Sequence, residues 1–144
     1  MHGEGDYAFV PALIGIARAT GMSAYMGDVG NVWPAVHRLD AARLFRLALE
    51  EAPPGTLLNA VGNPGVPFRD IAEAIGRHLD VPAKSITAEQ ARQHFGGFAA
   101  FAAFDVPASS ARTQERYGWR PVEPGLIADL DQGHYFHVRD DPER

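Results

Sequence analysis

The residues best suited to acid–base chemistry stand in one short stretch, residues 36–40, which read Val-His-Arg-Leu-Asp. An imidazole near a carboxylate can act as a general base near neutral pH, so His37 and Asp40 are the candidate catalytic pair. Arg38 lies between them and can pair with Asp28 or Asp40, or hold an anionic group of a ligand. A structural interpretation stays open, in which Asp40 caps a helix and His37 bonds to the backbone.

A second set of residues is suited to lining a small-molecule site. The candidate substrate-binding residues are Asn31, Trp33, Arg38, Phe98, Phe101, His134 and Tyr135. Phe98, Phe101 and Phe104 are three residues apart, so they can line one side of a helix. That side can be core packing, the apolar wall of a pocket or a subunit contact. For Asn31 and Trp33 the alternative is a turn asparagine and a core tryptophan.

Two histidines near the C-terminal end are of a type that can bind a metal ion. His134 and His137 are three residues apart, and with Asp131 they would make a two-histidine, one-carboxylate set. Both histidines follow Gly133, where we expect a helix to end, so they are not held on one helical face. The sequence therefore predicts no metal site.

The catalytic candidates need an element to position them, and the sequence predicts a strand that turns directly into a helix over residues 31–50. Pro34 keeps the preceding residue extended, and Asp40 is a good N-cap residue. Apolar residues then recur at helical spacing. The helix ends at residues 52–55, which read Ala-Pro-Pro-Gly, because proline cannot continue the hydrogen-bond ladder.

Further helices follow from apolar periodicity and capping signals. They are predicted from Phe9 to a stop at Gly21, from Phe68 to Leu79, from a Thr87–Gln90 capping box to Phe95, from Ser109 to Gly118, and from Pro124 to Gly133. Residues 22–27 are a short strand candidate, and residues 27–31 a turn.

Residues 56–62, Thr-Leu-Leu-Asn-Ala-Val-Gly, are predicted to form a strand buried on both faces. Together with the helix before it, this strand would be half of a βαβ unit. Its edge and apolar face must then be covered by a second copy, a swapped element or another protein. We therefore expect a homo-oligomer or a covering partner.

Composition narrows the class of protein. The chain has 144 residues, 46% of them hydrophobic, which suits one folded domain over residues 1–138 with a flexible tail at 139–144. The net charge of −5, without a run of basic residues, argues against nucleic acid or an anionic membrane as partner. There are no cysteines, and we find no signal peptide or membrane-length apolar run. We expect a cytoplasmic protein that binds a small molecule.

Five segments, in order, resemble the C-terminal portion of extended and atypical short-chain dehydrogenase/reductases, the NAD-dependent epimerase/dehydratase superfamily. They are His-Gly-Glu-Gly-Asp at 2–6, Gly-Asp at 27–28, the pattern Val-His-x-x-Asp-x-Ala at 36–42, Val-Pro-Phe-Arg-Asp-Ile-Ala at 66–72 and Tyr-Gly-Trp-Arg-Pro at 117–121. The resemblance spans about residues 2 to 137. It implies an α/β fold that is helix-rich, has a few short strands and lacks most of the Rossmann sheet.

Two features of that family are missing. Gly3 and Gly5 are not followed by a third glycine at the proper spacing, and no strand precedes them, so the dinucleotide turn is absent. The family's Tyr-x-x-x-Lys pair is absent too, since the single lysine, Lys84, has Asp80 four residues before it. The chain thus resembles the truncated back portion of an enzyme that uses NAD(P). We expect it to bind no cofactor alone.

Three functions follow as hypotheses. The first is the substrate-binding portion of an NAD(P)-dependent oxidoreductase or epimerase that acts on a small carbonyl or hydroxyl compound, unable to transfer hydride alone. The second is a cofactor-free acid–base catalyst, of isomerase or cyclase type, or a small-ligand-binding protein that uses the same cleft. The third is an interaction module that self-associates through its exposed sheet edge.

Overall fold

The computed structural model describes residues 1–27 and 30–137. Its fold is α/β and helix-rich, as the sequence predicts, with four short strands in two small sheets among these residues. The strands are β1 (Ser23–Met26), β2 (Val32–Ala35), β3 (Asn63–Pro67) and β4 (Ala83–Ile86). The helices are α1 (Phe9–Thr20), α2 (Arg38–Glu51), α3 (Phe68–Leu79), α4 (Ala88–Phe95), α5 (Ala99–Ala102), α6 (Ala111–Tyr117) and α7 (Leu126–Asp131), with 3₁₀ helices η1 (Gly96–Phe98) and η2 (His134–Phe136).

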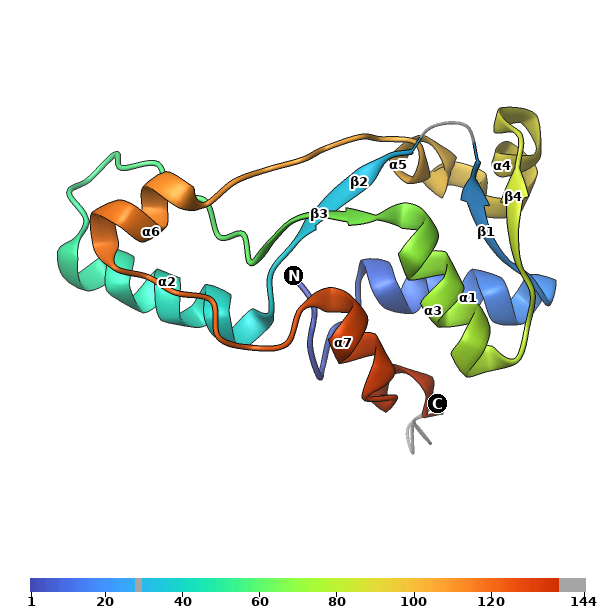
Figure 1. Cartoon of the computed structure of the whole chain (residues 1–144), viewed down its shortest axis with the longest axis horizontal. Helices are drawn as coiled ribbons and strands as arrows, with labels where there is room; N and C mark the ends of the chain where they lie inside the picture. The colour runs from blue at the N-terminus through green and yellow to red at the C-terminus, as the bar shows by residue number, and fades with distance from the viewer. Residues whose placement is uncertain (28–29, 138–144) are drawn as a thin grey trace.

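The molecule is elongated, and the ladder of β2 and β3 runs between its two ends (Figure 1). One end holds α1, α3, α4 and the parallel pair β1–β4, and the other holds α2 and α6. Strands β2 and β3 pair antiparallel, with Val32 opposite Pro67 and Trp33 opposite Val66. The register shifts between Trp33 and Ala35, around Pro34, which has no N–H to donate to a ladder. This ladder carries the chain from one end of the molecule to the other.

The major core lies at the end formed by α1, α3 and α4. Its buried members are Val10, Leu13, Ile14, Ala17, Ala24, Ala35, Val66, Phe68, Ile71, Ala74, Ile75, Ala91, Phe95, Ala102, Leu126 and Leu130. Helix α3 contributes the most regular stripe, because Phe68, Ile71 and Ile75 recur at helical spacing and are almost fully buried. Phe68 packs edge-to-face on Trp33 and Phe95, so it joins α3 to β2 and α4.

The minor core lies at the other end of the molecule. Its buried members are Val36, Ala41, Leu44 and Trp119, with Leu47, Leu58 and Ala60 partly buried against them. Trp119 Nε1–H donates to the carbonyl of Asp40 (3.0 Å), which fixes the segment after α6 on the start of α2. Helix α2 and the loop after it also carry three large exposed apolar side chains, which we call the uncovered face: Phe45, Leu49 and Leu57, exposed by 66%, 89% and 94%.

The helices predicted from the sequence are confirmed. Helix α1 ends at Gly21, whose φ of 67° is the left-handed conformation of a helix C-cap. At the start of α4, Thr87 Oγ1 accepts from Gln90 N–H and Gln90 Oε1 accepts from Thr87 N–H, which is the predicted capping box. The strand candidate at residues 22–27 is confirmed as β1.

The buried strand predicted for residues 56–62 is wrong. The segment forms no strand, and Leu57 lies in solvent. None of the four strands among residues 1–27 and 30–137 pairs with it, so its backbone bonds elsewhere. Asn59 N–H donates to Thr113 Oγ1 of α6 (3.0 Å), and Gly62 N–H donates to the carbonyl of Ala35 (2.8 Å). Strands β3 and β4 were not predicted, since each is short and lacks clear alternation.

The helix cap predicted at Asp40 is also wrong. His37 is the N-cap residue of α2, and its Nδ1 accepts a hydrogen bond from Leu39 N–H (3.3 Å). The structural role expected for His37, bonding to the backbone, is therefore present. Asp40 lies inside the first turn, and its carboxylate accepts instead from the backbone N–H groups of Val122 and Glu123. Local sequence identified the strand-to-helix junction but placed the cap three residues late.

Some expectations fall outside the described residues. These are the turn residues Asp28 and Val29, the alternative pairing of Arg38 with Asp28, the end of the predicted domain at residue 138 and the tail at 139–144. Within residues 1–27 and 30–137, the helices are too short or too polar to cross a membrane.

Candidate functional site

Three imidazoles surround one buried carboxylate, and we call this set the histidine cluster: His2, His37, His134 and Asp129. His2 Nδ1 lies 2.7 Å from Asp129 Oδ2. On the other oxygen, His134 Nε2 lies 3.8 Å and His37 Nε2 lies 4.0 Å from Asp129 Oδ1. The rings of His2 and His37 meet edge-to-face at 5.3 Å. The cluster therefore joins residues from distant parts of the sequence around a single carboxyl group.

The backbone places His2 beside His37. His2 N–H donates to the carbonyl of Val36 (3.0 Å), and Arg38 N–H donates to the carbonyl of His2 (2.8 Å), so the two histidines form a parallel β-bridge. Asp129 comes from the buried side of α7. Asn63 Oδ1 accepts from Leu126 N–H (3.1 Å) and fixes the start of that helix on β3.

Gly3 allows the amino-terminal segment to pass directly over the cluster. Its φ is 129°, and a Cβ there would lie 3.0 Å from His37 Nε2 and 3.1 Å from Arg38 Cγ. Its N–H donates to Tyr135 Oη (2.7 Å), which in turn donates to Asp6 Oδ2 (3.3 Å). Burial raises the pKa of the Tyr135 hydroxyl, so this group stays protonated and keeps its role as a donor.

The protonation state of His2 follows from its partners. Since a carboxylate only accepts hydrogen bonds, His2 carries its proton on Nδ1 and donates it to Asp129. Its Nε2 is buried and has no hydrogen-bond partner among the described residues, and the same is true of His134 Nε2. Burial lowers the pKa of His2 and outweighs the opposing effect of the bond to Asp129. His2 is therefore neutral at pH 7.

The cluster has a buried side and an accessible side. His2 and Asp129 are almost fully enclosed, whereas the side chains of His37 and His134 are exposed by 10% and 24%. An imidazole beside an ionised carboxylate can take up and return a proton near neutral pH. The arrangement can thus exchange protons with a ligand through His37 or His134, while Asp129 and His2 stay shielded behind them.

Asp40 belongs to a different network from His37. Its carboxylate accepts from Val122 N–H (2.9 Å), Glu123 N–H (3.0 Å) and the Arg43 guanidinium. Burial alone would raise the pKa of Asp40, but these hydrogen bonds hold it below its usual value. The structure therefore does not pair His37 with Asp40, and the carboxylate nearest to His37 is Asp129.

The other candidate substrate residues lie together at the opposite end of the β2–β3 ladder. Asn31 Nδ2 and Trp33 Nε1 both donate to the carbonyl of Phe104 (3.0 and 2.9 Å). The ring centroids of Trp33 and Phe9 are 3.7 Å apart, and a row of rings continues to Phe98 and beyond. We call this set the aromatic row: Trp33, Phe9, Phe98, Phe101 and Phe104, with neighbouring centroids 3.7–5.8 Å apart.

The structure thus divides the predicted site residues into two groups. His37, His134, Tyr135 and Arg38 gather around the amino-terminal segment, with Arg38 beside Gly3. Asn31, Trp33, Phe98 and Phe101 gather at the aromatic row. His134, His137 and Asp131 do not come together as a metal site, and no set of three histidine, aspartate or glutamate side chains within residues 1–27 and 30–137 is arranged to hold a metal ion.

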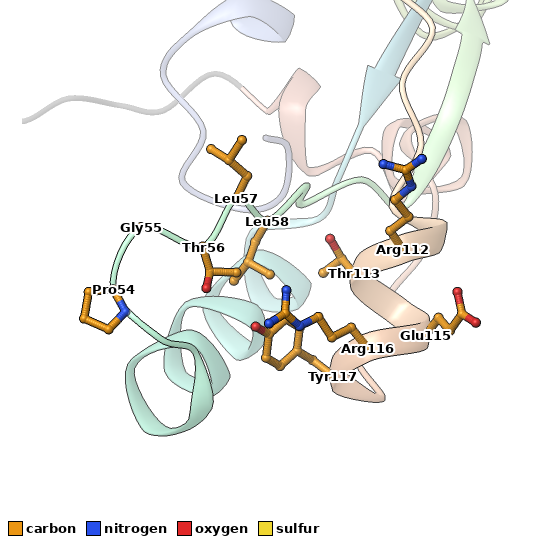
Figure 2. Close-up of a pocket in the computed structure, with 10 residues that line it drawn as sticks. All are labelled: Pro54, Gly55, Thr56, Leu57, Leu58, Arg112, Thr113, Glu115, Arg116 and Tyr117. Carbon is orange, nitrogen blue, oxygen red and sulfur yellow. The ribbon is translucent and has the colours of Figure 1, made fainter.

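A surface pocket of about 820 Å³ lies at the minor core and contains none of the predicted site residues. Figure 2 shows it between the loop at residues 54–58 and helix α6, with the Arg112 and Arg116 side chains extending from the helix. The guanidinium of Arg116 lies 5.3 Å from the centre of the Tyr117 ring. The pocket adjoins the uncovered face, because Leu57 belongs to both.

Two members of the histidine cluster were missed by sequence reasoning. His2 was noted only as part of a glycine-containing motif, and Asp129 was not noted at all. Asp129 lies between Leu126 and Leu130 on the apolar side of a predicted helix, where an ionisable residue needs a partner. That signal could have marked Asp129 as functional or paired, but it would not have named His2 as the partner 127 residues away.

Comparison with known proteins finds relatives of greater length. The chain is 48% identical over 136 residues to a protein of Schizosaccharomyces pombe, "Uncharacterized protein C2A9.02", covering 94% of this chain and 46% of that protein. It is 48% identical over 130 residues to "Uncharacterized protein YLL056C" of Saccharomyces cerevisiae, covering 90% of this chain and 44% of that protein. No protein family model matches the chain. It therefore spans about half the length of the curated relatives that it matches.

Proposed function

We propose that this chain is the substrate-binding, C-terminal portion of a cytoplasmic NAD(P)-dependent oxidoreductase or epimerase related to extended short-chain dehydrogenase/reductases. Its substrate would be a small carbonyl or hydroxyl compound. The observation that carries this proposal is the uncovered face, which leaves the minor core open on one side.

The uncovered face has the character of an interface. Phe45 and Leu49 are four residues apart on α2, so they share one side of the helix, and Leu57 follows in the loop. Large exposed apolar side chains that share one side of a helix, as Phe45 and Leu49 do, are typical of surfaces that bind another protein or domain. In the relatives, more than half of the sequence lies outside the matched region. That remainder is long enough to supply a sheet-bearing domain that covers α2.

The substrate would bind along the β2–β3 ladder. Asn31 and Trp33 stand at the start of β2, and His37 follows its end. The aromatic row offers an apolar surface, with Phe101 and Phe104 half exposed, while the accessible imidazoles of the histidine cluster offer donors and acceptors for a carbonyl or hydroxyl group. Specific recognition of small polar compounds needs this combination of apolar walls and a few polar groups.

Hydride transfer would depend on the rest of the longer protein. This chain has no glycine-rich dinucleotide turn and no Tyr-x-x-x-Lys pair. Fluorescence titration of NADH and NADPH tests the assignment. We expect no saturable signal with this chain and saturable binding by the full-length Saccharomyces relative. Stoichiometric binding of either nucleotide by this chain, or none by the full-length relative, would contradict the proposal.

The histidine cluster favours a second candidate, a cofactor-free acid–base catalyst or small-ligand-binding protein that uses the same residues. Its test is the change His37→Ala, which should abolish binding or turnover while the circular dichroism spectrum stays native. His137→Ala is the matched control, because His137 is exposed and makes no ion pair among the described residues. If His37→Ala retains full function and stability, this role for His37 is excluded.

A further inference from the structure

The histidine cluster connects side chains from four different segments of the fold. His2 belongs to the amino-terminal segment, His37 to the β2–α2 junction, Asp129 to α7 and His134 to η2. In Figure 1 the amino terminus lies between the two ends of the molecule, close to α7. The contacts of the cluster therefore add to the backbone hydrogen bonds of His2 and Arg38 and to the core packing of α7 in holding these segments together.

The charges in the cluster are balanced only when the imidazoles are mostly neutral. Asp129 is the one carboxylate within 4.0 Å of a nitrogen of His2, His37 or His134 among the described residues. It can compensate a single added proton. A proton on His2 Nε2 would be a buried donor with no acceptor in the described part of the chain, which costs the full desolvation of that group.

The other charged groups on the surrounding elements do not supply a second counter-charge. The amino group of Met1 and a protonated His37 both disfavour a charge on His2. Asp6 accepts from Tyr135 Oη, and Asp131 at the end of α7 is paired with Arg77 and His78 of α3. Other charged side chains on or beside these segments include Glu4, Arg38, which lies against Gly3, and Arg18, which donates to the carbonyl of Phe136. Asp40 and Arg43 of α2 pair with each other.

We propose that the histidine cluster is a pH-sensitive latch, which holds the amino-terminal segment, α7 and η2 against the β2–α2 junction at neutral pH and releases them in mild acid. The device is independent of the enzymatic role proposed above, because it needs only the four clustered side chains. Its effect would be to open the accessible side of the cluster and the β-bridge between His2 and His37.

The direction of the pH effect follows from the number of protons bound. The pKa of His2 in the folded chain is below the unfolded value of 6.5, so the open form binds more protons over the interval between these two values. Closure is therefore fully stable above pH 6.5 and weakens as the pH falls below it. With one proton taken up on opening, the opening constant rises by about tenfold per pH unit within that interval.

Hydrogen exchange on the unmodified chain and on His2→Asn tests the latch between pH 5 and 7.5. Asparagine keeps an N–H donor for Asp129 but does not titrate. The reporting amides are Gly3 and Arg38, which donate to Tyr135 Oη and to the carbonyl of residue 2, and Ile75 in α3 is the reference amide. Rates are corrected for the intrinsic pH dependence of exchange. His137→Asn is the matched control, an exposed histidine outside the cluster.

We expect the opening constants of Gly3 and Arg38 to rise about tenfold per pH unit below 6.5 in the unmodified chain and in His137→Asn. In His2→Asn the slope should flatten, and Ile75 should change less than the reporting amides in every chain. Equal slopes with and without His2, or the same rise at Ile75, would overturn the latch.

If His2→Asn does not fold, a second measurement tests the latch. Proton NMR of the unmodified chain gives the titration midpoint of His2 directly. A midpoint below 6.5, with loss of the Gly3 amide signal over the same range, supports the latch, whereas a midpoint at or above 6.5 overturns it.

Discussion

The two cores of this chain differ in how completely their apolar residues are enclosed. The major core draws on α1, β1, β3, α3, α4 and α7, and its large side chains, such as Phe68 and Ile75, have almost no exposed surface. The minor core draws on α2 and the segments flanking α6, and its helix has the large side chains Phe45 and Leu49 on the solvent side. The major core is enclosed by elements of this chain. The minor core is covered by this chain on only one side of α2.

This difference indicates that polar contacts contribute much of the stability of the minor core, because little apolar surface is buried there. Asp40 accepts three hydrogen bonds, and Trp119 donates one to the Asp40 carbonyl, so the segment at residues 119–123 is held on α2 mainly by directional bonds. We therefore expect apolar truncation to be costly in the major core, and loss of the Asp40 carboxylate to be costly in the minor core.

Phe68→Ala should have the largest effect. Removing this buried ring leaves a cavity between α3, β2 and α4, and Phe→Ala changes in cores cost about 3–5 kcal/mol. The matched control is Phe45→Ala on the uncovered face, which should change the free energy of unfolding by less than about 0.5 kcal/mol. Urea unfolding followed by circular dichroism gives both values. If Phe68→Ala and Phe45→Ala lower the free energy of unfolding by similar amounts, the proposed difference between the enclosed major core and the uncovered face is wrong.

Asp40→Asn should have the next largest effect, about 2–3 kcal/mol at pH 7. Hydrogen bonds to a charged group contribute about 1.5–3 kcal/mol, and an amide cannot accept from Val122, Glu123 and Arg43 in the same way. Glu115→Gln is the control. Glu115 is exposed on α6, so this change should alter the free energy of unfolding by less than about 0.5 kcal/mol. An Asp40→Asn chain as stable as the unmodified one would refute the role given to these bonds.

The same carboxylate gives a pH prediction. The pKa of Asp40 in the folded chain is below the unfolded value of 3.8, so its contribution to stability is present above pH 3.8 and is lost as the pH falls below that value. The stability difference between the unmodified chain and Asp40→Asn should therefore be constant from pH 7 to 5 and shrink toward pH 3. A difference that grows in acid would contradict the direction assigned to this pKa.

Gly3→Ala tests the contact between the two ends at the histidine cluster. A methyl group would press on His37 and Arg38 from a backbone conformation that only glycine adopts readily, at a cost of about 1–3 kcal/mol. Gly15→Ala is the matched control, because Gly15 is in α1 with no atoms near its Cβ position, and alanine there should stabilise by about 0.5–1 kcal/mol. If both changes stabilise, the close approach of Gly3 to His37 is not maintained in solution.

The double change Phe45→Gln with Leu49→Gln should have the smallest effect on stability, within about 0.5 kcal/mol, because both side chains are exposed. Its effect should appear in the molecular mass. Light scattering after size-exclusion chromatography should show association of the unmodified chain and a monomer for the double variant. A monomeric unmodified chain at high concentration would count against the homo-oligomer that the sequence predicts.

Sequence reasoning succeeded where the signal is local. Helix α3 has an apolar stripe every three or four residues, and α4 has its capping box, so both were predicted with their ends. It failed at residues 56–62, where an apolar run reads as a buried strand whether or not a partner strand exists. Pairing is a property of the whole fold, and the part of the chain that the structure describes has no strand for residues 56–62 to join.

The candidate site shows the same limit. His37, His134 and Tyr135 were selected from residue type and from the family resemblance, and the structure places them around one amino-terminal segment. The pairing of His37 with Asp40 was inferred from sequence proximity, whereas the nearer carboxylate, Asp129, is 92 residues away in the chain. Contacts between residues so far apart in the sequence depend on the topology of the fold, and they leave no pattern in the local sequence.

Native-state hydrogen exchange at pH 7 tests most directly whether the chain has one complete core and one incomplete core. We predict that buried amides of α3 exchange only through global unfolding, while amides of α2 and α6 exchange through a smaller opening at a free energy clearly below it. Exchange from α2, α6 and α3 at one common free energy would contradict this difference and show that the minor core is as self-sufficient as the major one.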